Sequence, residues 1–271
     1  HPRGVTPLDS VRVPSIGWYL RLEKDGFQPL EALVSGGGAD WRFALDSGRG
    51  SDAGMVVVPG GHMQELNLPS LERLGNVDVE TFRVDAREVT NQQFKSFVDS
   101  GGYRRREFWD VPMVLGGRPL AWEAAMARFT DRTGRPGPAT WEAGDFPNGQ
   151  ADYPVSGVSW YEAAAYAKFR GKSLPTIFHW VRAARTTSAA FIVPRSNIEG
   201  QGPAPVGSFH GVGPYGTYDM AGNVREWCAN DAGGSRYILG GGWNDPGYAF
   251  NDAYTQQPLD RSPTNGIRLV R

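Results

Sequence analysis

Two acidic residues near the C-terminal end of the chain, Asp219 and Glu226, have side chains suited to metal binding. Carboxylates are ligands that calcium prefers, and Gly222 between them lets the backbone fold back so that carbonyl oxygens point at the same place. The segment 213–227 therefore predicts a calcium site. One Asp, one Glu and several glycines are also typical of a tight surface turn, so both interpretations stay open at this point.

Histidine and cysteine offer little further chemistry. The four histidines show no spacing typical of a metal site, and the chain has neither a Gly-x-Ser-x-Gly motif nor a phosphate-binding loop. We interpret His179 as a packed or capping residue, because no second metal-type ligand is near it in the sequence. Cys228 follows Trp227 and is expected to be a small buried hydrophobe.

A loop region at 243–264 has the composition of a recognition surface, because it mixes rigid aromatic residues with adaptable polar ones. We expect Trp243 and Phe250 to belong to the core. The predicted ligand-binding residues are Asn244, Asp245, Tyr248, Asn251, Asp252 and Tyr254.

Charged residues of this C-terminal region are a second candidate for a polar site. Asp245, Asp252 and Asp260 with Arg261 and Arg268 are candidates for a shared pocket. Loops rich in glycine also contain such pairs for structural reasons, and we give this interpretation more weight.

Three helices are expected to position these loops. Thr90 followed by Gln93, and Ser159 followed by Glu162, are capping-box patterns, and Thr176 is a candidate N-cap for a third helix. Short alternating stretches at 55–59 and 79–84 predict strands. The sequence therefore predicts an α+β, loop-rich fold.

Two other parts of the sequence differ in pattern from these predicted helices and strands. Residues 1–50 contain short alternating stretches at 11–13, 18–22 and 41–45, and predict a small β-rich module ahead of a larger domain at 54–271. Residues 103–152 are rich in Trp, Arg, Pro and Gly. We expect the tryptophans of this insertion to fix it to the body, with a ligand-binding surface as the alternative.

Composition limits the function classes. The 271 residues are 40% hydrophobic with a net charge of −1, which argues against a nucleic-acid partner and against binding to anionic membranes. The single cysteine excludes an intramolecular disulfide, and no stretch resembles a signal peptide or an apolar span. These features favour a cytoplasmic location without membrane contact. The first residue, histidine, suggests a fragment or a processed chain.

Several motifs, in order along the chain, resemble one known family. The motifs are EVTNQQF at 88–94, PVSGVSW at 154–160, KSLPT at 172–176, YDMAGNVREW at 218–227, LGGGW at 239–243 and NGIRL at 265–269. Together they resemble the formylglycine-generating enzyme family, also called the sulfatase-modifying-factor domain. The resemblance runs from about residue 54 to residue 271, and it implies a C-type-lectin-like fold.

The resemblance also implies particular site residues. It places a structural calcium ion at Asp219, the carbonyls of Gly222 and Val224, and Glu226. A further calcium site of the family corresponds to 196–200, but the acidic continuation that completes it is missing here.

The oxidising members of the family hold copper with two cysteines shortly after the Gly-Gly-aromatic turn. Asp245 and Phe250 stand at these two positions. We therefore predict no copper and no catalytic residue, because neither side chain is a thiolate ligand.

The resulting hypothesis is a non-catalytic module that recognises a ligand or protein within a larger bacterial signalling protein, such as the C-terminal region of a serine/threonine kinase. One alternative is a diversified variable protein that binds ligands through 243–264. The other is a family enzyme with metal-dependent oxidase chemistry.

Overall fold

The computed structural model describes residues 4, 17–35, 43–47, 49–50, 52–63 and 76–271. The predicted strand at 11–13 lies outside these residues. A strand predicted at 41–45 is not formed at residues 43–45, which are irregular. The division into a module at 1–50 and a domain at 54–271 stays a prediction.

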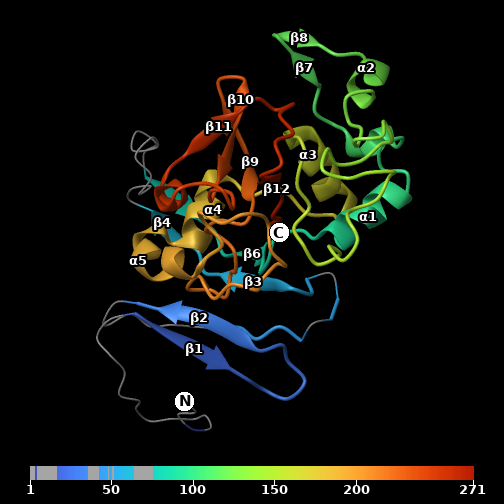
Figure 1. The fold of residues 1–271 in the computed structure, drawn as a ribbon. Coiled ribbons are helices and arrows are strands. Elements are labelled where there is room, and N and C mark those ends of the chain that lie inside the picture. Colours follow the sequence, from blue (N-terminus) through green and yellow to red (C-terminus); the bar gives the residue numbers. More distant parts are fainter. Residues whose placement is uncertain (1–3, 5–16, 36–42, 48, 51, 64–75) are drawn as a thin grey trace.

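Short helices and strands alternate along the described chain, so the predicted α+β, loop-rich class is confirmed (Figure 1). The helices are α1 (Asn91–Asp99), α2 (Trp122–Met126), α3 (Trp160–Phe169), α4 (Ile177–Ala184) and α5 (Ala189–Ile192), with 3-10 turns η2 (Arg106–Phe108), η3 (Thr186–Ser188), η4 (Val193–Arg195) and η5 (Gly247–Asn251). The strands are β1 (Trp18–Leu22), β2 (Leu30–Val34), β3 (Met55–Val58), β4 (Gly61–Met63), β5 (Val77–Val79), β6 (Phe82–Asp85), β7 (Val114–Leu115), β8 (Arg118–Pro119), β9 (Arg225–Ala232), β10 (Ser235–Leu239), β11 (Tyr254–Gln256) and β12 (Asn265–Gly266). No helix among the described residues is long and apolar enough to cross a membrane.

A four-stranded sheet with the order β11-β10-β9-β12 forms the centre of the body. Strands β9, β10 and β11 are antiparallel neighbours, and β12 pairs with β9 in parallel. The remaining strands form two-stranded pairs, including β3 with β6. The long β9–β10 ribbon therefore determines where the loops at its two ends lie (Figure 1).

Alternation along β9 and β10 divides the core into two clusters. Successive side chains of a strand point to opposite faces. Cys228 and Leu239 accordingly pack in one cluster with α4, whereas Trp227 and Ile238 pack in the other with α1 and α3. All four are fully buried, which confirms the burial expected for Cys228.

The predicted helix caps are confirmed. The hydroxyls of Thr90, Ser159 and Thr176 each accept a hydrogen bond of 3.2 Å from the backbone N–H three residues later. In α4 the reciprocal acceptor is His179, whose Nδ1 accepts from the N–H of Thr176 at 3.3 Å. A satisfied N-cap of this kind stabilises a helix by about 1 kcal/mol. His179 is therefore a capping residue, as expected.

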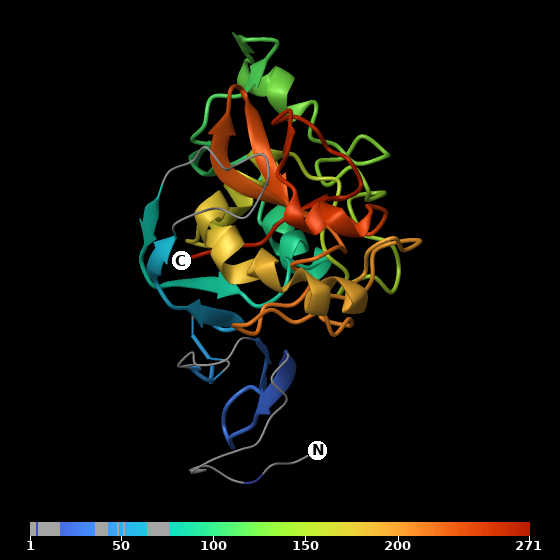
Figure 2. The ribbon, with the colours of Figure 1, turned by 90° about the vertical axis from the view of Figure 1, so that its left-hand side faces the viewer.

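The β1–β2 hairpin lies along β3 and closes one end of the body (Figures 1 and 2). Leu30 and Leu33 belong to the core cluster that contains α4. The Leu33 N–H donates to the carbonyl of Gly213 at 3.1 Å, and the Tyr218 hydroxyl donates to Glu31 at 3.0 Å. Apolar burial and polar contacts together fix the hairpin to the body.

Tryptophans fix the 103–152 insertion to the body, as expected. Trp141 is fully buried, and its Nε1 donates to Asn91 of α1 at 3.0 Å. The Nε1 of Trp109 donates to the carbonyl of Gly102 at 2.9 Å, and its ring packs edge-on against Trp122. These rings serve the packing of the insertion.

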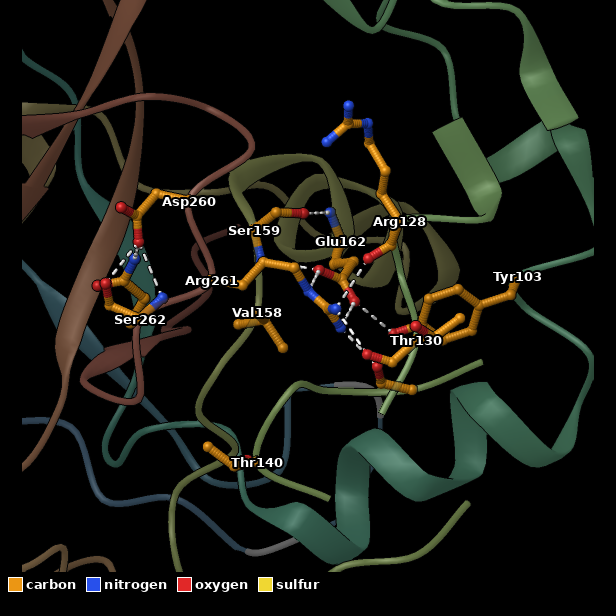
Figure 3. Close-up of polar contacts among 12 residues, drawn as sticks. Tyr103, Arg128, Thr130, Thr140, Val158, Ser159, Glu162, Asp260, Arg261 and Ser262 are labelled. Carbon is orange, nitrogen blue, oxygen red and sulfur yellow. Dashed lines mark hydrogen bonds and ion pairs between the residues drawn. The ribbon is translucent and has the colours of Figure 1, made fainter. Parts of the chain in front are cut away.

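Arg261 joins the insertion to α3 (Figure 3). Its guanidinium pairs with the fully buried carboxylate of Glu162, which also caps α3. It also donates to the backbone carbonyls of Arg128, Thr130 and Gly137. One side chain thus holds a helix, the insertion and the C-terminal loop together.

Candidate functional site

Two loops of the central sheet form the base of the candidate site. The 219–224 loop precedes β9, and the 240–243 turn follows β10. The N–H of Gly222 donates to the carbonyl of Gly240 at 2.9 Å, and the N–H of Trp243 donates to the carbonyl of Asn223 at 2.8 Å. Gly240 has a φ of 99°, and a Cβ there would lie 2.9 Å from the carbonyl oxygen of Met220. This close approach requires glycine and fixes the start of the predicted recognition loop.

Arg225 organises the middle of that loop. Its guanidinium pairs with both oxygens of Asp245, at 2.7 and 2.6 Å, and lies over the ring of Tyr254 at 5.1 Å. Asp245 also accepts from the N–H of Gly242 at 2.6 Å. Asp245 and Tyr254 are thus brought together, and both are engaged in contacts within the protein.

Other predicted ligand-binding residues remain open to solvent. Asn244 is exposed, and Tyr248 has the largest exposed fraction, 68%, of the large apolar side chains described as exposed. Asn251 and Asp252 are half-buried. Trp243 is half-buried as well, so only one of the two expected core aromatics is in the core.

Polar groups in this loop are not all used by the fold. Among the described residues, Trp243 Nε1 and Asn251 Oδ1 are buried and have no hydrogen-bond partner. Native proteins leave few buried polar groups without a hydrogen-bond partner. These two atoms lie in the same loop as the exposed Asn244 and Tyr248.

Two of the four predicted calcium ligands, Asp219 and Glu226, lie near a buried arginine. Arg268 is fully buried, and its Nε donates to Glu226 Oε1 at 2.8 Å. The other oxygen of Glu226 accepts from Trp180 Nε1 at 2.7 Å. Asp219 accepts from the N–H of Gly207 at 2.5 Å.

These contacts do not fit a calcium ion. Both oxygens of Glu226 already have donors, and the positive charge beside it is the Arg268 guanidinium. Binding of calcium through Glu226 would require Arg268 to leave.

Burial of acidic groups around Arg268 has an electrostatic consequence. The pKa of Asp219 is raised to about 6, first by burial and also by the nearby Glu226. The N–H of Gly207 and the guanidinium groups of Arg268 and Arg87 oppose this shift in pKa. The pKa of Glu88 is raised well above its usual range, first by burial and then by Asp219 and Glu226. Burial also raises the pKa of Glu226, although Arg268 opposes this shift. The interior therefore holds more carboxyl groups than Arg268 alone can balance.

The charged residues proposed for a shared polar pocket do not converge. Asp245 pairs with Arg225, Arg261 with Glu162, and Arg268 with Glu226. Asp260 instead accepts from Ser262 and Asn265 in its own loop. Across the described part of the chain, no three His, Cys, Asp or Glu side chains are grouped so that they could hold a metal ion.

Residues 44–271 match the sulfatase-modifying factor enzyme 1-like domain. The chain belongs to this family. A relative from Bos taurus, inactive Cα-formylglycine-generating enzyme 2, is 30% identical over 80% of this chain and 84% of its own length. The serine/threonine-protein kinase pkn1 of Chlamydia pneumoniae is 29% identical over 96% of this chain, which spans only 36% of the kinase. Among solved structures, Treponema denticola variable protein 1 has a TM-score of 0.53 with 17% identity, covering 80% of this chain and 94% of that one, and so shows the fold alone.

Family membership gives meaning to two positions after the Gly240–Trp243 turn. At the two positions where the family resemblance implies copper cysteines, Asp245 is paired with Arg225 and Phe250 is fully buried, packed on Trp180 at 6.0 Å between ring centroids. The remaining thiol, Cys228, is fully buried in the core, and burial raises its pKa well above the usual range. A thiolate is therefore disfavoured at Cys228.

Sequence reasoning missed Arg225, and it named Arg268 without its partner Glu226. Arg225 and Arg268 both lie inside family motifs, at 218–227 and 265–269. Nothing in residue type or spacing identifies which carboxylate each one contacts. The signal available in the sequence was a positively charged residue inside each of these two motifs.

Proposed function

We propose that this chain is a non-catalytic recognition module of the sulfatase-modifying factor family, which binds a ligand or a protein partner through residues 243–264. The observation that carries the proposal is that Asp245 and Phe250, at the positions where the family resemblance implies copper cysteines, have other roles in this structure. Asp245 serves an ion pair and Phe250 serves the core. A relative named inactive supports the same interpretation.

The loop itself supports recognition. Its base is fixed by backbone hydrogen bonds to the 219–224 loop and by the Arg225–Asp245 pair. Asn244 and the Tyr248 ring project from this base into solvent. A rigid base with exposed aromatic and amide groups binds at low entropic cost, because few side chains need to be ordered on binding.

We further propose that the module belongs to a larger bacterial signalling protein. The similarity to the Chlamydia pneumoniae kinase extends over nearly all of this chain but about a third of the kinase. A module of this size joined to a kinase would supply binding, and the kinase would supply catalysis.

Site-specific photo-crosslinking tests the recognition surface. A photoreactive phenylalanine analogue replaces Tyr248 in the complete host protein, and the matched control places it at Phe209, which is exposed outside the loop. The proposal expects one discrete crosslinked species from position 248, reduced by Asn244→Ala, and none from position 209. Equal crosslinking at both positions, or none at 248, would contradict it.

A further inference from the structure

A pocket of about 460 Å³ is lined by residues of the β1–β2 hairpin and of strand β3. Its walls come from the hairpin, from β3, from the segment after β6 and from the turn before Tyr218. None of its lining residues belongs to the recognition loop at 243–264. The pocket is therefore independent of the proposed recognition surface.

Part of the pocket lining is apolar. Leu30 of the hairpin, Met55 and Val56 of β3, and Ala86 contribute to this part. All four are buried side chains of the body and hairpin. The size and the apolar wall are typical of a small-molecule site, where a few polar groups add orientation.

Most charged groups that line the pocket already have partners. Arg21 pairs with Glu31 at 2.8 Å, and Glu31 also accepts from the Tyr218 hydroxyl at 3.0 Å. Asp46 accepts from the N–H of Gly54 at 2.9 Å. Arg21 and Glu31 pair within the hairpin, and the Tyr218 hydroxyl links Glu31 to the body.

Arg87 differs from these groups. Its guanidinium lies over the Tyr218 ring at 4.9 Å, and within the described ranges it forms no ion pair and no side-chain hydrogen bond. It also borders a second pocket of about 190 Å³, next to the Asp85–Lys172 pair. The charge of Arg87 also acts on the buried Asp219, but the guanidinium N–H groups form no side-chain hydrogen bond with the residues that the structure describes and so remain available to a ligand in the pocket.

We propose that this pocket binds a small amphipathic anion, with a carboxylate or phosphate group on Arg87 and an apolar body on Leu30, Met55 and Val56. The planar guanidinium can donate two parallel hydrogen bonds to either head group. The ligand contacts both the hairpin and the body, so its binding stabilises the docked hairpin by mass action.

Calorimetry with four probes tests the proposal: octanoate, octyl phosphate, acetate and octanol. The wild-type chain is expected to bind at least one octyl anion, and the stronger of the two identifies the preferred head group. Acetate lacks the apolar body and octanol lacks the charge. Each is therefore expected to bind more weakly than the octyl anion by a factor of about ten or more, and tenfold corresponds to about 1.4 kcal/mol.

Arg87→Gln is expected to weaken binding of the octyl anion about tenfold, since a charge-assisted hydrogen bond contributes about 1.5 to 3 kcal/mol. The matched control is Arg83→Gln, because Arg83 lies on β6, pairs with Asp52 and does not line the pocket. Thermal melts without ligand establish that both variants are folded. The proposal fails if neither octyl anion saturates the wild-type chain, or if Arg87→Gln binds as tightly as Arg83→Gln.

Discussion

The guanidinium of Arg261 lies against the buried carboxylate of Glu162, with Nε 2.9 Å from one oxygen and Nη2 2.9 Å from the other (Figure 3). Glu162 also accepts from the hydroxyl of Tyr103 and from the N–H of Ser159. Burial raises the pKa of the Tyr103 phenol well above its usual range, and the Glu162 carboxylate adds to this shift. Every oxygen of this buried carboxylate therefore has donors, which is the condition under which a buried ion pair is tolerated.

Arg261→Lys is expected to lower the free energy of unfolding by about 3 kcal/mol, because lysine cannot replace the forked contacts to Glu162 and to three carbonyls. Chemical denaturation measures the loss. Hydrogen exchange is expected to show faster exchange at residues 128–137 than in β9 and β10.

Arg132→Lys is the control for this change, since Arg132 is an exposed arginine of the same insertion. Its expected effect is within about 0.5 kcal/mol. Equal losses for Arg132→Lys and Arg261→Lys would show that the Glu162 pair does not hold the insertion.

The His179 cap predicts a pH-dependent stability. Burial lowers the pKa of His179 in the folded chain below its ordinary value of 6.5. As the pH falls through 6.5, the unfolded chain takes up the proton first, so the free energy of unfolding decreases. Protonation of Nδ1 would also remove the acceptor for the Thr176 N–H.

His179→Gln is expected to remove this loss below pH 6.5 while keeping the cap, because Gln93 performs the same role in α1. Denaturation curves at several pH values measure the effect. His210→Gln, at an exposed histidine, is the control. If His179→Gln and the wild-type chain show the same pH dependence, the cap does not titrate as argued.

Short-range sequence patterns predicted the helices and their caps well. Contacts between residues distant in the sequence account for the features that these patterns did not predict. The caps at Thr90, Ser159 and Thr176 depend on residues three positions apart, so the sequence contains the complete signal. The burial of Cys228 was expected from its position beside Trp227.

The site was harder to predict because its charges pair across the fold. Arg268 contacts a carboxylate 42 residues earlier, and Arg261 one 99 residues earlier. The calcium hypothesis assumed that Glu226 was free. Only the tertiary structure, which inserts Arg268 and Trp180 beside it, identifies which donors use its oxygens.

Calcium chelation separates the Arg268 arrangement from a calcium site. If Arg268 balances Glu226, as in this structure, EGTA is expected to leave the Tm of the wild-type chain unchanged. Differential scanning calorimetry with EGTA and with added calcium measures this. A lower Tm in EGTA, restored by calcium, would support the calcium site at Asp219 and Glu226 instead.

Arg268→Met is expected to destabilise the chain by about 3 to 5 kcal/mol, because it leaves the buried Glu226 without its positive partner. Adding Glu226→Gln is expected to recover part of the loss, since glutamine can still accept from Trp180 without a charge. Urea denaturation of the single and double variants gives the interaction energy. No recovery in the double variant would show that packing, and not charge, explains the cost.

The chain is expected to show no formylglycine-generating activity. A copper site held by thiolates needs two of them, and the chain has only Cys228, which is buried with a raised pKa. Incubation of a cysteine-containing sulfatase peptide with the chain, copper and oxygen is expected to leave the peptide mass unchanged, whereas an active formylglycine-generating enzyme converts the peptide in the same assay.

Asp245→Cys with Phe250→Cys is not expected to create activity, because it removes a core ring at a cost of about 3 to 5 kcal/mol and leaves Arg225 without its carboxylate. Turnover by the wild-type chain that is lost in Cys228→Ser would overturn the non-catalytic assignment.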